Sequence, residues 1–93
     1  MNATQPIVGG RQYTVSIGKR NGRFGLRLRF GDDRVVTVVG SRHANIPKGC
    51  RIVAVEGCRL AEMTLMRTFL MEVFETQERV TLTLDKALNC RQL

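Results

Sequence analysis

The sequence predicts an α+β fold, a five- to six-stranded and mostly antiparallel partly open barrel or sandwich that is capped by one long helix and one short helix. Three observations predict it. Most apolar runs alternate with polar residues at the period of a strand, glycine-containing turns separate these runs, and one segment has the spacing of an amphipathic helix. The 93 residues suffice for one domain. We place it at residues 12–86, between a flexible leader or linker at 1–11 and a C-terminal tail at 87–93.

The first forty residues predict three strands. Residues 12–17 alternate with Tyr, Val and Ile on one face, as a half-buried strand does. The pair Asn21-Gly22 favours the positive backbone dihedrals of a hairpin turn. Residues 24–30 alternate again, with apolar side chains on one face and mostly arginine on the other. Residues 35–39 are rich in β-branched side chains and predict the third strand.

The second half of the chain predicts the helices and the last two strands. Residues 40–49 are polar and broken by Pro47, so they have room for one short helical turn before a strand at 51–55. The long helix is expected from Thr64, as its N-cap, to about residue 75. A final alternating strand is expected at 80–84. The apolar residues at helical spacing are Met66, Phe69, Leu70, Val73 and Phe74.

The charge of the chain is concentrated in its first half. The formal net charge is +7, and residues 1–51 carry ten Lys/Arg against two acids, whereas residues 52–93 carry five against six. A positive field of this kind attracts acidic peptides, phosphates or anionic membranes and speeds encounter with them. The field alone does not select among these partners.

Catalytic and metal-binding patterns are not found in the sequence. Cys50, Cys58 and Cys90 contain no Cys-x-x-Cys pair, and His43 is the only histidine, so we expect neither a metal nor another cofactor. No Gly-x-Ser-x-Gly elbow is present, and we expect the protein not to be an enzyme. No apolar run approaches the length of a membrane span. We expect a cytoplasmic protein with reduced thiols, or a domain of a larger protein at the membrane or cytoskeleton.

The order of these elements resembles the PDZ family over roughly residues 12–86. Residues 23–26, Arg-Phe-Gly-Leu, resemble the carboxylate-binding loop of that family. Residues 48–57 resemble its segment Gly-Asp-x-Ile-Leu-x-Val-Asn-Gly, although Cys50 stands for the usual Asp and Glu56 for the usual Asn. Residues 79–82 resemble its closing strand.

The resemblance implies a module that binds the C-terminal tails of other proteins as an added strand. The carboxylate-binding loop would be Arg23, Phe24, Gly25 and Leu26. Lys19 or Arg20 would be the supporting base. An apolar first helix position, which is Leu65 or Met66 by two ways of counting, implies a hydrophobic third-last ligand residue, the class II preference. The implied peptide groove comprises Leu26, Arg27, Leu28, Arg29, Leu65, Met66, Phe69, Leu70 and Val73.

Other interpretations of the same residues stay open. The alternating apolar side chains are also what a plain core requires, and Arg27 and Arg29 either form a solvated face or favour acidic residues near the ligand's end. A basic module that binds the phosphates of anionic lipid or nucleic acid is the main alternative function, although no specific nucleic acid is expected because the only aromatic residues are one Tyr and four Phe. A third alternative is self-association, with Leu93 of one copy filling the groove of another.

Overall fold

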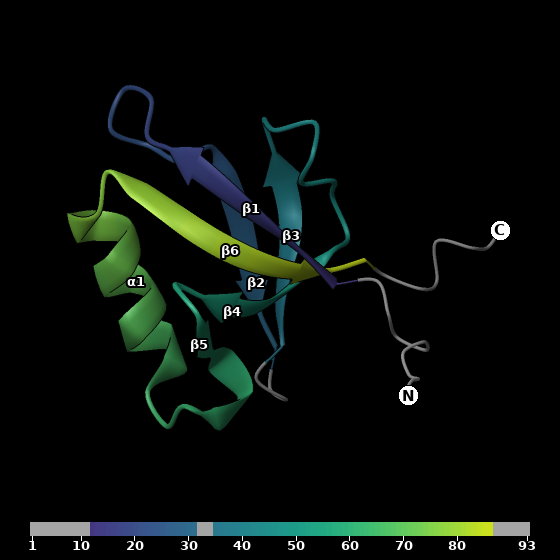
Figure 1. The fold of residues 1–93 in the computed structure, drawn as a ribbon, viewed down its shortest axis with the longest axis vertical. Coiled ribbons are helices and arrows are strands. Elements are labelled where there is room, and N and C mark those ends of the chain that lie inside the picture. The colour runs from purple at the N-terminus through teal and green to yellow at the C-terminus, as the bar shows by residue number, and fades with distance from the viewer. Residues whose placement is uncertain (1–11, 32–34, 87–93) are drawn as a thin grey trace, which may run out of the picture.

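The computed structural model describes residues 12–31 and 35–86. Its one α-helix, which has three turns, follows five of the six strands in the chain, and the last strand comes after it (Figure 1). The elements are β1 (Gln12–Gly18), β2 (Leu26–Phe30), β3 (Val36–Ser41), β4 (Arg51–Val55), β5 (Cys58–Arg59), the 3-10 helix η1 (Leu60–Glu62), α1 (Met66–Thr76) and β6 (Arg79–Asp85).

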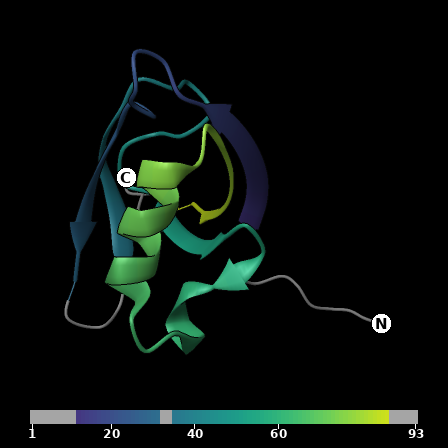
Figure 2. The same cartoon turned by 90° about the vertical axis from the view of Figure 1, so that its left-hand side faces the viewer.

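The strands form one antiparallel sheet in the order β1-β6-β4-β3-β2, with the short β5 paired to β4. The predicted α+β class is therefore confirmed in its coarse form. Figure 2 shows the sheet curving around α1, with β2 on one side of the helix and β1 on the other. Consequently β2 and β1 are the two edge strands, and the helix lies beside the β2 edge.

Alternation on the strands and one stripe of the helix build the core. On β6 the residues at alternate positions, Val80, Leu82 and Leu84, are fully buried, because this strand pairs with β1 on one side and β4 on the other. The helix contributes the stripe Met66, Leu70 and Val73. The other buried apolar residues are Val15, Ile17, Phe24, Val36, Val38, Ile46, Cys50, Ile52, Ala54, Val55 and Leu60.

Two tight turns have the backbone that their sequences favour. Asn21 and Gly22 both have positive φ, at 56° and 77°, and the flanking residues Arg20 and Arg23 exchange backbone hydrogen bonds of 2.8 and 3.2 Å. This matches the hairpin turn expected for Asn-Gly. Glu56 and Gly57 also have positive φ, and they connect β4 to β5. The Glu56 carboxylate accepts a 2.8 Å hydrogen bond from the Thr81 amide, which ties this turn to β6.

The long helix is confirmed to within two residues at its start, whereas the short helix lies at another place in the chain than predicted. The α-helix begins at Met66, and its N-cap is Leu65 rather than Thr64, which lies in the preceding turn and supplies no capping bond. Residues 42–50 contain only separate turns instead of the short helix. The short helix is η1, which follows β5 and buries Leu60. Burial of one apolar side chain, rather than local helix propensity, explains this second position.

The described cysteines differ in environment. Cys50 is buried in the core and Cys58 is exposed, and both are free thiols. Burial raises the pKa of the Cys50 thiol, and desolvation likewise raises the pKa of Tyr13, whose hydroxyl donates to the Asn45 carbonyl at 3.0 Å.

Within residues 12–31 and 35–86 no cluster of potential metal ligands occurs. In the same ranges no helix is long and apolar enough to cross a membrane.

Replacing a central β6 side chain tests this description of the core. We expect Leu82→Ala to lower the free energy of unfolding by about 2–4 kcal/mol, because the residue is fully buried and its removal leaves a cavity. Leu65→Ala is the control, since Leu65 is 69% exposed and its truncation should change stability by less than ~0.5 kcal/mol. Urea unfolding measures both, and equal losses would contradict the assigned burial.

Candidate functional site

The second strand has one edge that no described strand covers. In the sheet order β2 is terminal and pairs only with β3. Its other edge faces α1 (Figure 2). The space between strand and helix is a groove of about 360 Å³ whose walls are mainly apolar. Its lining residues are Leu28, Phe30, Leu70, Met71, Phe74 and Glu75.

Two hydrogen bonds that bracket β2 show which of its backbone groups face this groove. The Gly25 carbonyl accepts from the Arg42 amide at 3.0 Å, and the Gly31 amide donates to the Val35 carbonyl at 2.8 Å. Both odd-numbered residues therefore direct backbone groups toward β3. Backbone groups of a strand alternate between its two edges. The pairing register shifts after Arg27, but the extra residue lies in β3, so the alternation along β2 is not interrupted. The residues that present N–H and C=O to the free edge are Leu26, Leu28 and Phe30.

The backbone of the predicted carboxylate loop is held by one neighbouring segment. The carbonyls of Arg23, Phe24 and Gly25 accept hydrogen bonds from the Arg42 side chain (3.1 Å), the His43 ring (2.6 Å) and the Arg42 amide (3.0 Å). In a trans peptide unit the N–H points opposite to the C=O, and no described peptide bond is cis. The amides of the three following residues therefore point away from the 42–43 segment, and that of Leu26 lies at the uncovered edge of β2.

Glycine is required at the centre of this loop. Gly25 has φ of 80°, a conformation that L side chains rarely adopt. A Cβ at Gly25 would lie 2.7 Å from two guanidinium atoms of Arg42, whose side chain packs flat against the loop. Gly25 thus permits both the backbone turn and the approach of the arginine that holds the Arg23 carbonyl.

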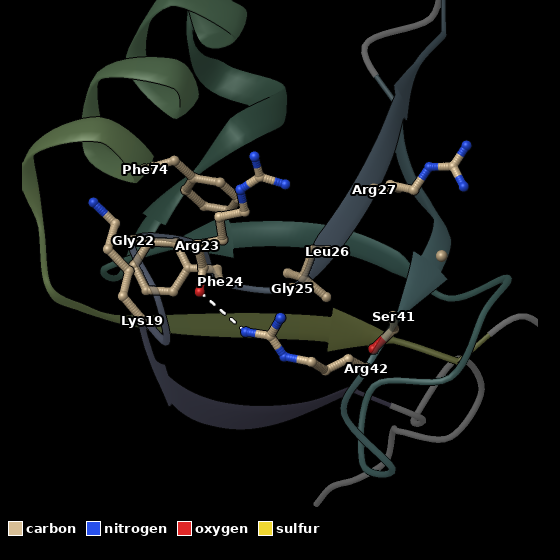
Figure 3. A pocket seen from close by; sticks show the side chains of 11 residues that line it. Lys19, Gly22, Arg23, Phe24, Gly25, Leu26, Arg27, Ser41, Arg42 and Phe74 are labelled. Carbon is tan, nitrogen blue, oxygen red and sulfur yellow. Dashed lines mark hydrogen bonds between the residues drawn. The ribbon is translucent and has the colours of Figure 1, made fainter.

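Positive charge surrounds the loop. A second hollow, of about 580 Å³, is lined by Lys19, Arg23, Arg27 and Arg42 and by no acidic residue. Figure 3 shows Arg42 reaching under the loop from the end of β3, while Arg27 projects outward from β2. Of the residues predicted for the site, all four of the loop line this hollow. The loop therefore lies in a positive field that would attract an anion.

The two predicted supporting bases lie in different places. Lys19 donates to the Glu75 carbonyl at 3.1 Å and lies 5.4 Å from the centre of the Phe24 ring, so it joins the loop to the end of α1. Arg20 is exposed and does not line the hollow. Arg42, which was not among the predicted site residues, also lies beside the loop. Nothing local in the sequence distinguishes Arg42 from other surface arginines, because only the β2–β3 pairing brings it to Gly25.

The helix faces the groove with other residues than those expected. Leu65 and Met66 do not line this part of the groove, but both line a hollow of about 300 Å³ next to it, which shares Phe30 with the groove. Of the remaining predicted helix residues only Leu70 lines the groove, whereas Phe69 and Val73 pack against or within the core. Met71 and Phe74 were missed, although both flank the buried stripe at helical spacing. Met71 is 61% exposed.

The aromatic residues close the loop end of the groove. The rings of Phe24 and Phe74 lie 5.1 Å apart at an interplanar angle of 57°, and Figure 3 shows them between the helix and the loop.

No protein-family model and no curated protein matches this chain. Functional inference therefore depends on the geometry of the groove, the loop and their charges.

A pair of glycine substitutions tests the contact between Gly25 and Arg42. Gly25 and Gly57 have nearly equal φ, 80° and 81°, but a Cβ at Gly57 would meet no atom within 4 Å. Each change to Ala should lower the free energy of unfolding by about 1–2 kcal/mol, because an alanine side chain is strained in the left-handed backbone conformation. Gly25→Ala should cost about 1 kcal/mol more, because the displaced guanidinium loses its bond to the Arg23 carbonyl.

The double variant isolates this extra cost. In an Arg42→Ala background, chemical denaturation should give equal losses for Gly25→Ala and Gly57→Ala, because no guanidinium then remains to be displaced. Equal losses already in the unmodified background would show that Arg42 does not constrain the loop.

Proposed function

We propose that this chain is a PDZ-like, non-enzymatic interaction module that binds the C-terminal tail of a partner protein by adding it as a strand to β2. The observation that carries the proposal is that Arg42 and His43 hold the carbonyls of residues 23–25, which leaves the amides of residues 24–26 directed away from that segment. Successive backbone N–H groups of this kind bind a terminal carboxylate. An unpaired strand edge binds an extended backbone.

The free backbone groups define the register of such a tail. An antiparallel strand with its carboxylate at the loop places its last residue opposite Leu26, its third-last opposite Leu28 and its fifth-last opposite Phe30. Directly opposed side chains lie on the same face of a sheet. These three ligand side chains would therefore point toward α1, and the second-last and fourth-last would share the outer face with Arg27 and Arg29.

The class II preference has support from different residues than the sequence indicated. Leu65 and Met66 line the hollow beside Phe30 rather than the part of the groove beside Leu28. A third-last ligand side chain opposite Leu28 would instead meet Leu70 and Met71 across the groove. Because these side chains are apolar and Met71 is largely exposed, a hydrophobic residue there would bury surface on both sides.

A second candidate function uses the same loop. The hollow formed by Lys19, Arg23, Arg27 and Arg42 is concave and carries no acidic side chain, which favours binding of a phosphate group from anionic lipid or nucleic acid. Salt separates the two functions. Phosphate-dominated binding should fall by orders of magnitude between low and physiological salt, whereas groove binding of an apolar tail should fall modestly.

Amidation of the ligand tests carboxylate capture. Peptides with hydrophobic last and third-last residues should lose about tenfold or more in affinity when the terminal carboxylate is amidated, because hydrogen bonds to a charged group contribute about 1.5–3 kcal/mol each. Fluorescence anisotropy or calorimetry measures the pair. Equal affinity of the acid and the amide would rule out carboxylate capture.

The other edge of the sheet provides the control for location. On addition of the free-acid peptide, the amide NMR signals of Leu26, Leu28 and Phe30 should shift, because these groups become hydrogen-bonded. Signals from β1, the other edge strand, should stay unchanged. Shifts confined to β1 would place the ligand at the wrong edge.

A further inference from the structure

Past Phe30 the groove adjoins a hollow of about 300 Å³, which Arg67 lines together with Leu65 and Met66. Arg67 is exposed and lies four residues before Met71, so both share the helix face that borders the groove. The Arg67 guanidinium carbon lies 4.8 Å from the centre of the Phe30 ring. Arg67 therefore reaches from the first turn of α1 to the last residue of β2.

This position coincides with one ligand residue. In the register defined above, the fifth-last residue lies opposite Phe30, and its side chain points to the same face as the Phe30 ring. Arg67 stacks on that ring. A guanidinium on an aromatic face keeps its N–H groups available at its edge, in the planar arrangement that matches a carboxylate.

We propose that Arg67 makes the groove select an acidic side chain at the fifth-last position of the bound tail. This inference rests on the proposed function, since it uses the register of an added strand. The groove then requires different chemistry along its length. The last and third-last side chains face apolar residues, and the fifth-last faces Arg67.

The local charges favour this assignment. The lining of the groove includes one acidic residue, Glu75, and it lies at the opposite end of α1 from Arg67. Neither of the two ion pairs between described residues, Arg51–Asp85 and Arg59–Glu62, involves Arg67. A ligand carboxylate would thus meet a guanidinium that is held by Phe30.

The test compares peptides that differ in the place of a single charge. Each ends in Leu with a Leu at the third-last position, and carries either Glu or Lys at the fifth-last or at the fourth-last position. The unmodified protein should bind the fifth-last Glu peptide about tenfold more tightly than the fifth-last Lys peptide, as expected for a charge-assisted pair that is partly exposed. Calorimetry at physiological salt gives the affinities.

Charge reversal assigns the effect to Arg67. Arg67→Glu should invert the preference at the fifth-last position and leave the preference at the fourth-last unchanged, because that side chain faces Arg27 and Arg29 instead. Arg67→Gln should abolish the fifth-last preference without inverting it. Lys48→Glu is the matched control, since it makes the same change in net charge at an exposed residue in the β3–β4 connection. It should leave both preferences in place.

The outcomes separate this inference from the function on which it rests. If amidation weakens binding but Arg67→Glu and Lys48→Glu have equal effects, the assignment of Arg67 is wrong and carboxylate capture stands. A Glu preference that follows Arg67 at the third-last rather than the fifth-last position would also overturn the assignment. If amidated and free-acid peptides bind equally, or no peptide binds, both proposals fail.

Discussion

The site depends on a constraint in the loop before β2, where three successive carbonyls are tied to one neighbouring segment. Arg42 and His43 hold the carbonyls of residues 23–25. Because a peptide unit is planar and trans, fixing these oxygens also fixes the amides of the next residues on the opposite side. Gly25 can adopt the positive φ that this loop requires, and the Arg42 side chain occupies the space that a Cβ would take.

Two features protect the edge of β2 that no described strand covers. Exposed edges invite pairing with other chains, and proteins commonly protect them with charge or with a covering element. Here the outer face of β2 carries Arg27 and Arg29, and α1 lies beside its inner side (Figure 2). Both devices discourage indiscriminate pairing. They leave room for an extended chain whose terminal charge suits the loop and whose side chains suit the groove.

Charge and apolar surface have separate roles around this edge. Cations gather at the loop, where Lys19, Arg23, Arg27 and Arg42 come from three different parts of the chain. Their field would speed encounter with an acidic tail over distances of about a Debye length. The apolar residues of the groove act only at contact. The helix joins the two regions, because Lys19 binds its C-terminal end and its apolar side chains line the groove.

The sequence by itself determined the elements whose signal is local. Alternation predicted the main strands of the sheet, because the burial of one face imposes a period of two. The Asn21-Gly22 turn followed from backbone preference, and Gly25 has the positive φ that glycine permits. The helix was placed within two residues of its observed start. In each case neighbours in the chain carry the information.

Only the tertiary structure decided which residues meet across the groove. Arg42 reaches Gly25 through strand pairing, and the stripe that α1 buries sets which of its flanking residues, Met71 and Phe74, turn toward β2. The spacing of apolar residues on a helix shows which stripe is apolar, but not what the margins of that stripe contact. For this reason the apolar spacing did not show that Met66 packs mainly in the core and reaches only the hollow beside Phe30. Side-chain partners distant in sequence are set by the packing of the whole sheet, which no local pattern encodes.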